Sequence, residues 1–104
     1  YGLFRAGAAV ELYYEMTGAI PGGRYRHEIA VFRAKGDGEE MERRPVVALA
    51  FDEPADATLL RSRRTLQLGR LKPGRYVVEV RVSGEGDATA PRRRAFRIVP
   101  ADAR

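Results

Sequence analysis

The fold class of this chain follows most directly from one stretch, Leu71-Lys72-Pro73-Gly74-Arg75-Tyr76, which continues as Val77-Val78-Glu79-Val80-Arg81-Val82. Pro73 and Gly74 favour a turn, because proline fixes φ and glycine accepts positive φ. After the turn, every second residue from Tyr76 onward is apolar and falls on one face, which is typical of a half-buried β-strand. We therefore predict a turn that leads into a strand at residues 75–83.

Five other stretches have the patterns of β-strands, at residues 9–16, 24–34, 46–52, 64–68 and 92–99. The stretch 9–16 alternates cleanly between apolar and polar residues. The stretch 46–52 is continuously apolar, which predicts a strand buried on both faces. Residues 56–64 would also suit a helix, but Leu66 and Leu68 alternate and lead directly into the turn. We therefore favour a crossing segment followed by a strand.

Short strands that are separated by turn signals, without a convincing helix, are typical of a β-sandwich. We predict an all-β chain that folds as an antiparallel sandwich of two sheets, with six to seven strands. The sandwich domain would span residues 9–100, after a linker or lead-in strap at 1–8 and before a tail at 101–104. The chain does not begin with methionine, so we expect a piece of a longer protein.

The composition restricts the classes of function. With 104 residues, of which 44% are hydrophobic and 32% charged, the chain has the size and balance of one globular domain. It contains no cysteine, which excludes disulfides, thiolate metal sites and cysteine nucleophiles. No apolar run approaches the roughly 20 residues of a membrane helix, so we expect no membrane insertion.

Few residues have the chemistry of an active site. His27 is the only histidine, and a general base would need a serine such as Ser62 or Ser83 and an orienting carboxylate. Neither serine is near His27 in the sequence. We therefore expect a histidine at the edge of the core or on the surface, and no enzyme activity.

Carboxylates form three clusters in or beside the predicted loops, and these are Asp37/Glu39/Glu40/Glu42, Asp52/Glu53/Asp56 and Glu85/Asp87. Calcium needs several oxygen ligands that converge from a loop of defined spacing, and none of these groups has that spacing. Zinc sites of the usual type lack their ligands as well. We predict neither a metal site nor a cofactor.

The net charge is +5, and only Lys35 and Lys72 of the 19 basic residues are lysines. Two groups of arginines are candidates for binding an anionic partner, namely Arg61, Arg63 and Arg64, and Arg92, Arg93 and Arg94. On a strand, Arg92 and Arg94 face one side and Arg93 the other. The run also fits a charged edge that prevents aggregation. Nucleic acid is the least favoured anion, because no stacking aromatics are interleaved with the arginines.

The order Leu71, Pro73, Gly74 and Tyr76 before a valine-rich strand resembles the tyrosine corner of immunoglobulin-like and fibronectin type III-like sandwiches. In that corner, a buried tyrosine bonds through its hydroxyl to the backbone just upstream. The resemblance implies this role for Tyr76, and it implies an immunoglobulin-like arrangement of the strands.

A wider set of residues is similar to the C-terminal β-sandwich of bacterial GWxTD-type proteins, and it comprises Val10-Glu11-Leu12-Tyr13-Tyr14-Glu15, Tyr25, Thr65-Leu66, Leu71-Lys72-Pro73-Gly74-Arg75-Tyr76 and Phe96. The GWxTD motif itself is not in this sequence. The similarity implies a non-catalytic accessory module of a larger bacterial protein, in an extracytoplasmic location. Its partners would be other domains of the parent protein or another protein. The alternative is a module that binds an anionic glycan or another polyanion through the arginine groups.

Overall fold

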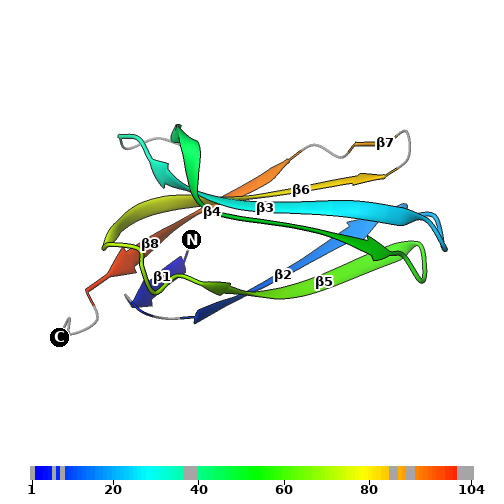
Figure 1. Cartoon of the computed structure of the whole chain (residues 1–104), viewed down its shortest axis with the longest axis horizontal. Helices are drawn as coiled ribbons and strands as arrows, with labels where there is room; N and C mark the ends of the chain where they lie inside the picture. The colour runs from blue at the N-terminus through cyan, green and yellow to red at the C-terminus, as the bar shows by residue number, and fades with distance from the viewer. Residues whose placement is uncertain are drawn as a thin grey trace.

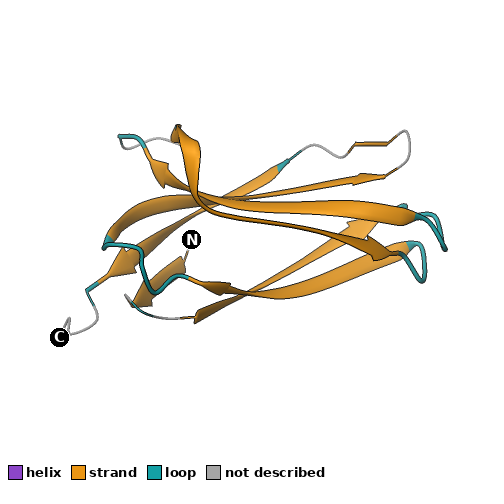
Figure 2. Ribbon diagram, in the orientation of Figure 1, coloured by secondary structure: helices purple, strands orange, loops and turns teal. Residues whose placement is uncertain are grey.

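The computed structural model describes residues 2–5, 7, 9–36, 40–84, 87–88 and 91–100, so the predicted tail at 101–104 lies outside the described residues. The strands are β1 (Gly2–Arg5), β2 (Ala9–Thr17), β3 (Arg24–Ala34), β4 (Met41–Pro54), β5 (Leu59–Gln67), β6 (Gly74–Gly84), β7 (Asp87–Ala88) and β8 (Arg92–Val99). No helix interrupts them within these ranges (Figure 2). The prediction of an all-β chain with two sheets is confirmed.

The strands form two layers, which are seen edge-on in Figure 1. The larger sheet has the order β1-β8-β6-β3-β4, with β7 paired to the end of β6, and the smaller sheet consists of β2 and β5. All described pairs are antiparallel except β1 with β8. β1 lies within the predicted lead-in at 1–8, where it adds a parallel strand beside the end of β8.

The core lies between the layers, where each strand turns alternate side chains inward. One cluster of buried residues contains Ile29, Val31, Leu66, Leu68, Tyr76, Val78, Phe96 and Ile98. A second cluster toward the other end contains Ala19, Tyr25, Ala55, Leu60 and Val82. The inward residues of β2 are only half-buried, because among the described strands β2 has a partner, β5, on one side only.

Tyr76 is held at the start of β6, directly after the Pro-Gly turn. Its side chain is 0% exposed, and its hydroxyl donates a hydrogen bond of 2.5 Å to the carbonyl oxygen of Lys72. The Tyr76 ring also stacks on Phe96, with 5.6 Å between the ring centroids. Gly74 has φ of +156°, a conformation that residues with a side chain rarely adopt. The turn therefore places the Tyr76 side chain so that its ring packs in the core while its hydroxyl bonds to the loop at Lys72.

Two expectations about the strands were wrong. The stretch 46–52 is not buried on both faces, because it belongs to β4, which lies at the edge of the larger sheet and leaves Val46 40% and Leu49 38% exposed. The segment 59–63 is neither a crossing segment nor helical. It pairs with β2 as part of β5, and that pairing runs from Leu59 to Gln67.

The sequence predicts no membrane insertion, and the structure can be searched for a membrane-spanning helix. The described part of the chain contains no helix of the length and hydropathy that crossing a bilayer requires.

Candidate functional site

The only histidine of the chain lies in a polar cluster between the two sheets. His27 on β3 is 0% exposed, so the alternative of a surface histidine was wrong; the ring lies beside the two core clusters and belongs to neither of them. A hydrogen bond of 2.6 Å joins its Nδ1 to the hydroxyl of Tyr14 on β2. Its ring stacks on Phe51 of β4, with 4.7 Å between the centroids and 10° between the planes. His27 is buried because it shares the inward face of β3 with Tyr25 and Ile29.

Arg64 and Glu53 complete this cluster. Arg64 on β5 pairs with Glu53 on β4, and its guanidinium lies 3.9 Å from the centroid of the Phe51 ring. Burial lowers the pKa of His27, and Arg64 adds to this effect, whereas Glu53 and Asp52 oppose it. Within the described residues, three buried polar atoms have no hydrogen-bond partner: Nε2 of His27, Oγ of Ser62 and Nε of Arg64.

The chemistry of this cluster is limited by its burial. Ser62 faces Tyr14 across the β2–β5 pair, and its side chain is buried. Its hydroxyl forms no hydrogen bond with His27, whereas a serine nucleophile needs a bond of this kind to its general base. A substrate would also have to separate the two sheets to reach either side chain. The geometry therefore favours a role in holding the sheets together.

The structure distributes the first arginine group over two surfaces. Arg61 and Arg63 point outward from β5 and pair with Glu15 and Glu11 of β2, at 3.8 Å and 2.8 Å. Arg64 lies between the sheets instead, because alternate residues of a strand face opposite sides. These three residues do not form one patch.

The second arginine group is divided in the same way. Arg93 on β8 pairs with Glu79 of β6 at 2.7 Å. Arg92 and Arg94 lie opposite Val80 and Val78 of β6, on the face that carries the buried Phe96. Both side chains are exposed, and neither forms an ion pair with another described residue.

We predict that Arg64→Ala lowers the free energy of unfolding by about 1–2 kcal/mol, because it removes the stacking on Phe51 and leaves Glu53 half-buried without its partner. Arg61→Ala and Arg63→Ala should each cost about 0–1 kcal/mol, since both ion pairs are exposed to solvent. Urea unfolding of the three variants at one pH tests this order. Equal losses in all three would contradict the special position of Arg64.

A long hollow of about 1120 Å³ runs between β2 and β8, and we call it the β2–β8 groove. The apolar part of its lining comprises Val10, Leu12, Tyr14, Met16, Leu66, Leu68, Val78, Val80, Val82 and Phe96. The rest of the lining comprises Glu11, Tyr13, Glu15 and Thr17 of β2 and the segment 91–94. The groove exists because the smaller sheet has two strands and leaves part of the facing sheet uncovered. No sequence motif predicts this groove, because it depends on the order of the strands in the two sheets.

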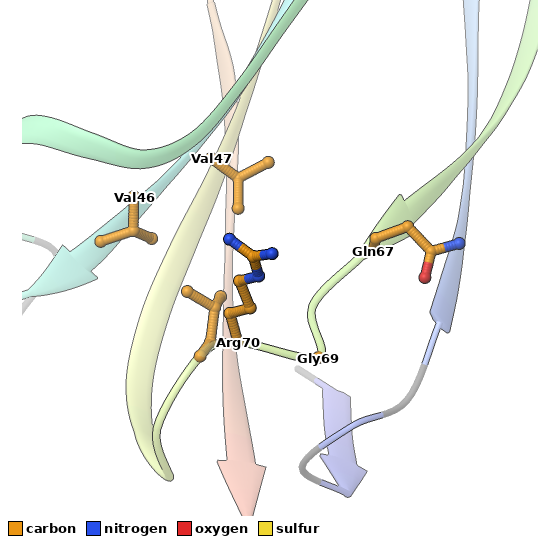
Figure 3. Close-up of a pocket in the computed structure, with 6 residues that line it drawn as sticks. Val46, Val47, Gln67, Gly69 and Arg70 are labelled. Atoms are coloured by element: carbon orange, nitrogen blue, oxygen red, sulfur yellow. The ribbon is translucent and has the colours of Figure 1, made fainter.

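A smaller hollow of about 440 Å³ lies beside the exposed edge of β4 (Figure 3). It is lined by Val46 and Val47 of β4 and by Gln67, Gly69, Arg70 and Leu71 around the turn before β6. Figure 3 shows the Arg70 side chain pointing from the turn toward Val47. The hollow therefore extends the apolar surface of β4 toward the Pro-Gly turn.

The carboxylates of the predicted loops form no metal site among the residues that the structure describes. Among the described residues, no three histidine, aspartate or glutamate side chains converge as metal ligands do. Asp37, Glu39 and Glu85 lie outside the described residues. Comparisons of the chain with protein-family models, with curated proteins and with solved structures gave no match.

Proposed function

We propose that the chain is a non-catalytic, immunoglobulin-like accessory module that contacts other domains of a larger bacterial protein outside the cytoplasm. The strand order supports the immunoglobulin-like assignment. If β2, β3, β4, β5, β6 and β8 correspond to B, C, C′, E, F and G, one sheet contains B and E and the other contains G, F, C and C′, as in that fold. Tyr76 then occupies the start of strand F, where a tyrosine corner belongs.

The observation that carries the proposed contact is the exposed apolar edge formed by β4. Charged residues lie near both ends of this strand, but the stretch 46–51 carries none. Val46 and Leu49 are the most exposed large hydrophobic residues of β4. Isolated domains usually protect a sheet edge with charges or bulges, because an open apolar edge recruits other chains. Coverage by a neighbouring domain explains why β4 lacks this protection in its middle.

The polyanion alternative has weaker support from the arginines. Arg61, Arg63, Arg64 and Arg93 are all engaged with carboxylates of the chain. Only Arg92 and Arg94 of the two groups remain without such a partner in the described part of the chain. A pair of cations is a small footprint for a polyanion, whose affinity rises with each phosphate or sulfate that is neutralised.

Hydrogen exchange of the 104-residue chain, alone and within its full-length parent protein, tests the proposal. We expect the backbone amides of residues 46–51 to exchange more slowly in the parent, because a neighbouring domain covers the edge. Equal exchange rates in both would contradict the contact. A hydrolase activity that disappears in a folded His27→Phe variant would contradict the non-catalytic role.

We predict that Ala48→Lys changes the unfolding free energy of the chain by less than about 0.5 kcal/mol, since Ala48 is exposed on an edge strand. In the parent protein, the same charge should remove the slow exchange of residues 46–51. Thr65→Lys, an exposed position on β5, is the matched control and should leave the protection intact. Retained protection in Ala48→Lys would show that the edge is not the contact surface.

A further inference from the structure

The free edge of β2 borders the β2–β8 groove. In the described part of the chain β2 pairs only with β5, so the backbone N–H and C=O groups of its other edge face no described strand, which is the arrangement that an added strand requires. β2 contains nine residues, and a strand of that length spans about 30 Å. An extended peptide segment of similar length can therefore form a ladder along this edge, as in β-strand addition.

The floor of the groove is apolar. Val78 and Val82 of β6 and Phe96 of β8 are buried there, and Val80 between them is half-buried. A strand added beside β2 would direct every second side chain toward this floor. Apolar side chains at those positions would complete the burial of Val80 and of the half-buried inward residues of β2.

The β8 side of the groove rim is positively charged. On the β2 side, Glu11 and Glu15 also line the groove, but they pair with Arg63 and Arg61. Arg92 and Arg94 project from the inward face of β8, on the side that the smaller sheet leaves open. The neighbouring Arg93 is already neutralised by Glu79 on the opposite face. Since Arg92 and Arg94 have no carboxylate partner among the described residues, and the whole chain carries +5, the β8 side of the rim favours carboxylates from outside the chain.

We propose that the β2–β8 groove binds an extended segment of a separate acidic protein. The segment adds a strand to β2, places apolar side chains over Val80 and Phe96, and directs carboxylates to Arg92 and Arg94. This surface is distinct from the β4 edge, so the inference goes beyond the proposed contact within the parent protein. A second copy of the chain fits less well, because it would bring the same positive charge to the rim.

Fluorescence anisotropy with synthetic nine-residue peptides tests this inference. The probe has threonine at odd positions and glutamate, glutamate, valine and valine at the even ones, and it is made in both sequence orders. We expect saturable binding by the glutamate peptide that is about tenfold tighter than for a peptide with lysine in place of glutamate. A peptide with proline at alternate threonines should not bind, because proline cannot donate to the ladder.

Matched variants of the chain locate the site. The double variant Arg92→Ser/Arg94→Ser should weaken binding about tenfold. Arg43→Ser/Arg44→Ser removes the same charge from exposed positions of β4, outside the groove lining, and should change binding less than about twofold. Slower hydrogen exchange of β2 amides in the peptide complex would support strand addition, and circular dichroism checks that both variants fold.

Four results would overturn the inference. The first is an absence of saturable peptide binding, and the second is an equal loss of binding in both double variants. The third is binding of a heparin hexasaccharide that needs Arg92 and Arg94 while the peptides do not bind, which would assign these arginines to a polyanion. Sedimentation that reveals a dimer with protected β2 amides would assign the groove to a second copy and overturn it as well. None of these results depends on the exchange of β4, so the two proposals fail separately.

Discussion

Tyr76→Ala should lower the free energy of unfolding by about 3–5 kcal/mol, the usual cost of removing a buried aromatic ring. The Tyr76 side chain is fully buried, stacks on Phe96 and holds the carbonyl of Lys72 through its hydroxyl. Its removal leaves a cavity in the larger core cluster and an unpaired carbonyl in the turn. Because small domains are stable by only about 5–15 kcal/mol, we expect a melting temperature lower by many degrees, or an unfolded variant, in a calorimetric or urea experiment.

Two further variants separate the ring from its hydroxyl. Tyr76→Phe keeps the stacking and loses only the bond to Lys72, so it should cost about 1 kcal/mol. Tyr13→Ala removes a tyrosine that is 47% exposed on β2 and should cost about 0.5 kcal/mol or less. If Tyr76→Ala were as mild as Tyr13→Ala, the buried phenol would not be the main anchor of the turn.

Local patterns were sufficient to predict the strands whose ends carry strong signals. β3 and β8 have the same bounds as the predicted strands at 24–34 and 92–99. Gly22 and Gly23 precede the first, whereas Pro91 and Pro100 flank the second. The alternation in β2 puts Val10, Leu12, Tyr14 and Met16 on one face, and this is the half-buried face in the structure. The agreement is expected, because the period of a strand is fixed by the pleat and does not depend on its neighbours.

Properties that depend on strand order could not be predicted in this way. The apolar stretch 46–52 has the composition of a central strand, but its burial depends on how many strands flank it, and only β3 flanks β4 among the strands that the structure describes. β5 is longer than expected because pairing with β2 overrides the weak local preference of residues 59–63. The segment 2–5 is short, and it becomes a strand through its pairing with β8.

The candidate sites show the same division between local and long-range information. The alternation of Arg92, Arg93 and Arg94 between two faces could be inferred from the period of a strand. That Arg93 meets Glu79, whereas Arg92 and Arg94 lie at the groove, depends on the register of β6 with β8. In the same way, the contact between Tyr14 and His27 joins residues of different sheets. A scan for nearby partners in the sequence could not find it.

We expect the stability of the folded chain to fall as the pH is lowered from about 7 to 5, because burial lowers the pKa of His27 from its usual value of 6.5. Below pH 6.5 the unfolded chain binds a proton at His27 that the folded chain does not bind, so protonation favours unfolding. Above that pH, His27 is neutral in both states, and its protonation takes nothing from the free energy of unfolding. As the pH falls from 6.5 toward the lower pKa that His27 has in the folded chain, the free energy of unfolding decreases by up to about 1.4 kcal/mol per pH unit.

The surroundings of His27 allow a clean test of this pH dependence. The titratable or charged groups around it are Tyr14 from β2, Asp52 and Glu53 from β4, and Arg64 from β5. The carboxylates favour the charged imidazole, but burial outweighs them. Since His27 is the only histidine and carboxylates titrate near pH 4, urea unfolding between pH 5 and 7 isolates its effect. His27→Phe keeps a ring against Phe51 and should flatten the profile, so parallel profiles for the two proteins would exclude His27 as the cause.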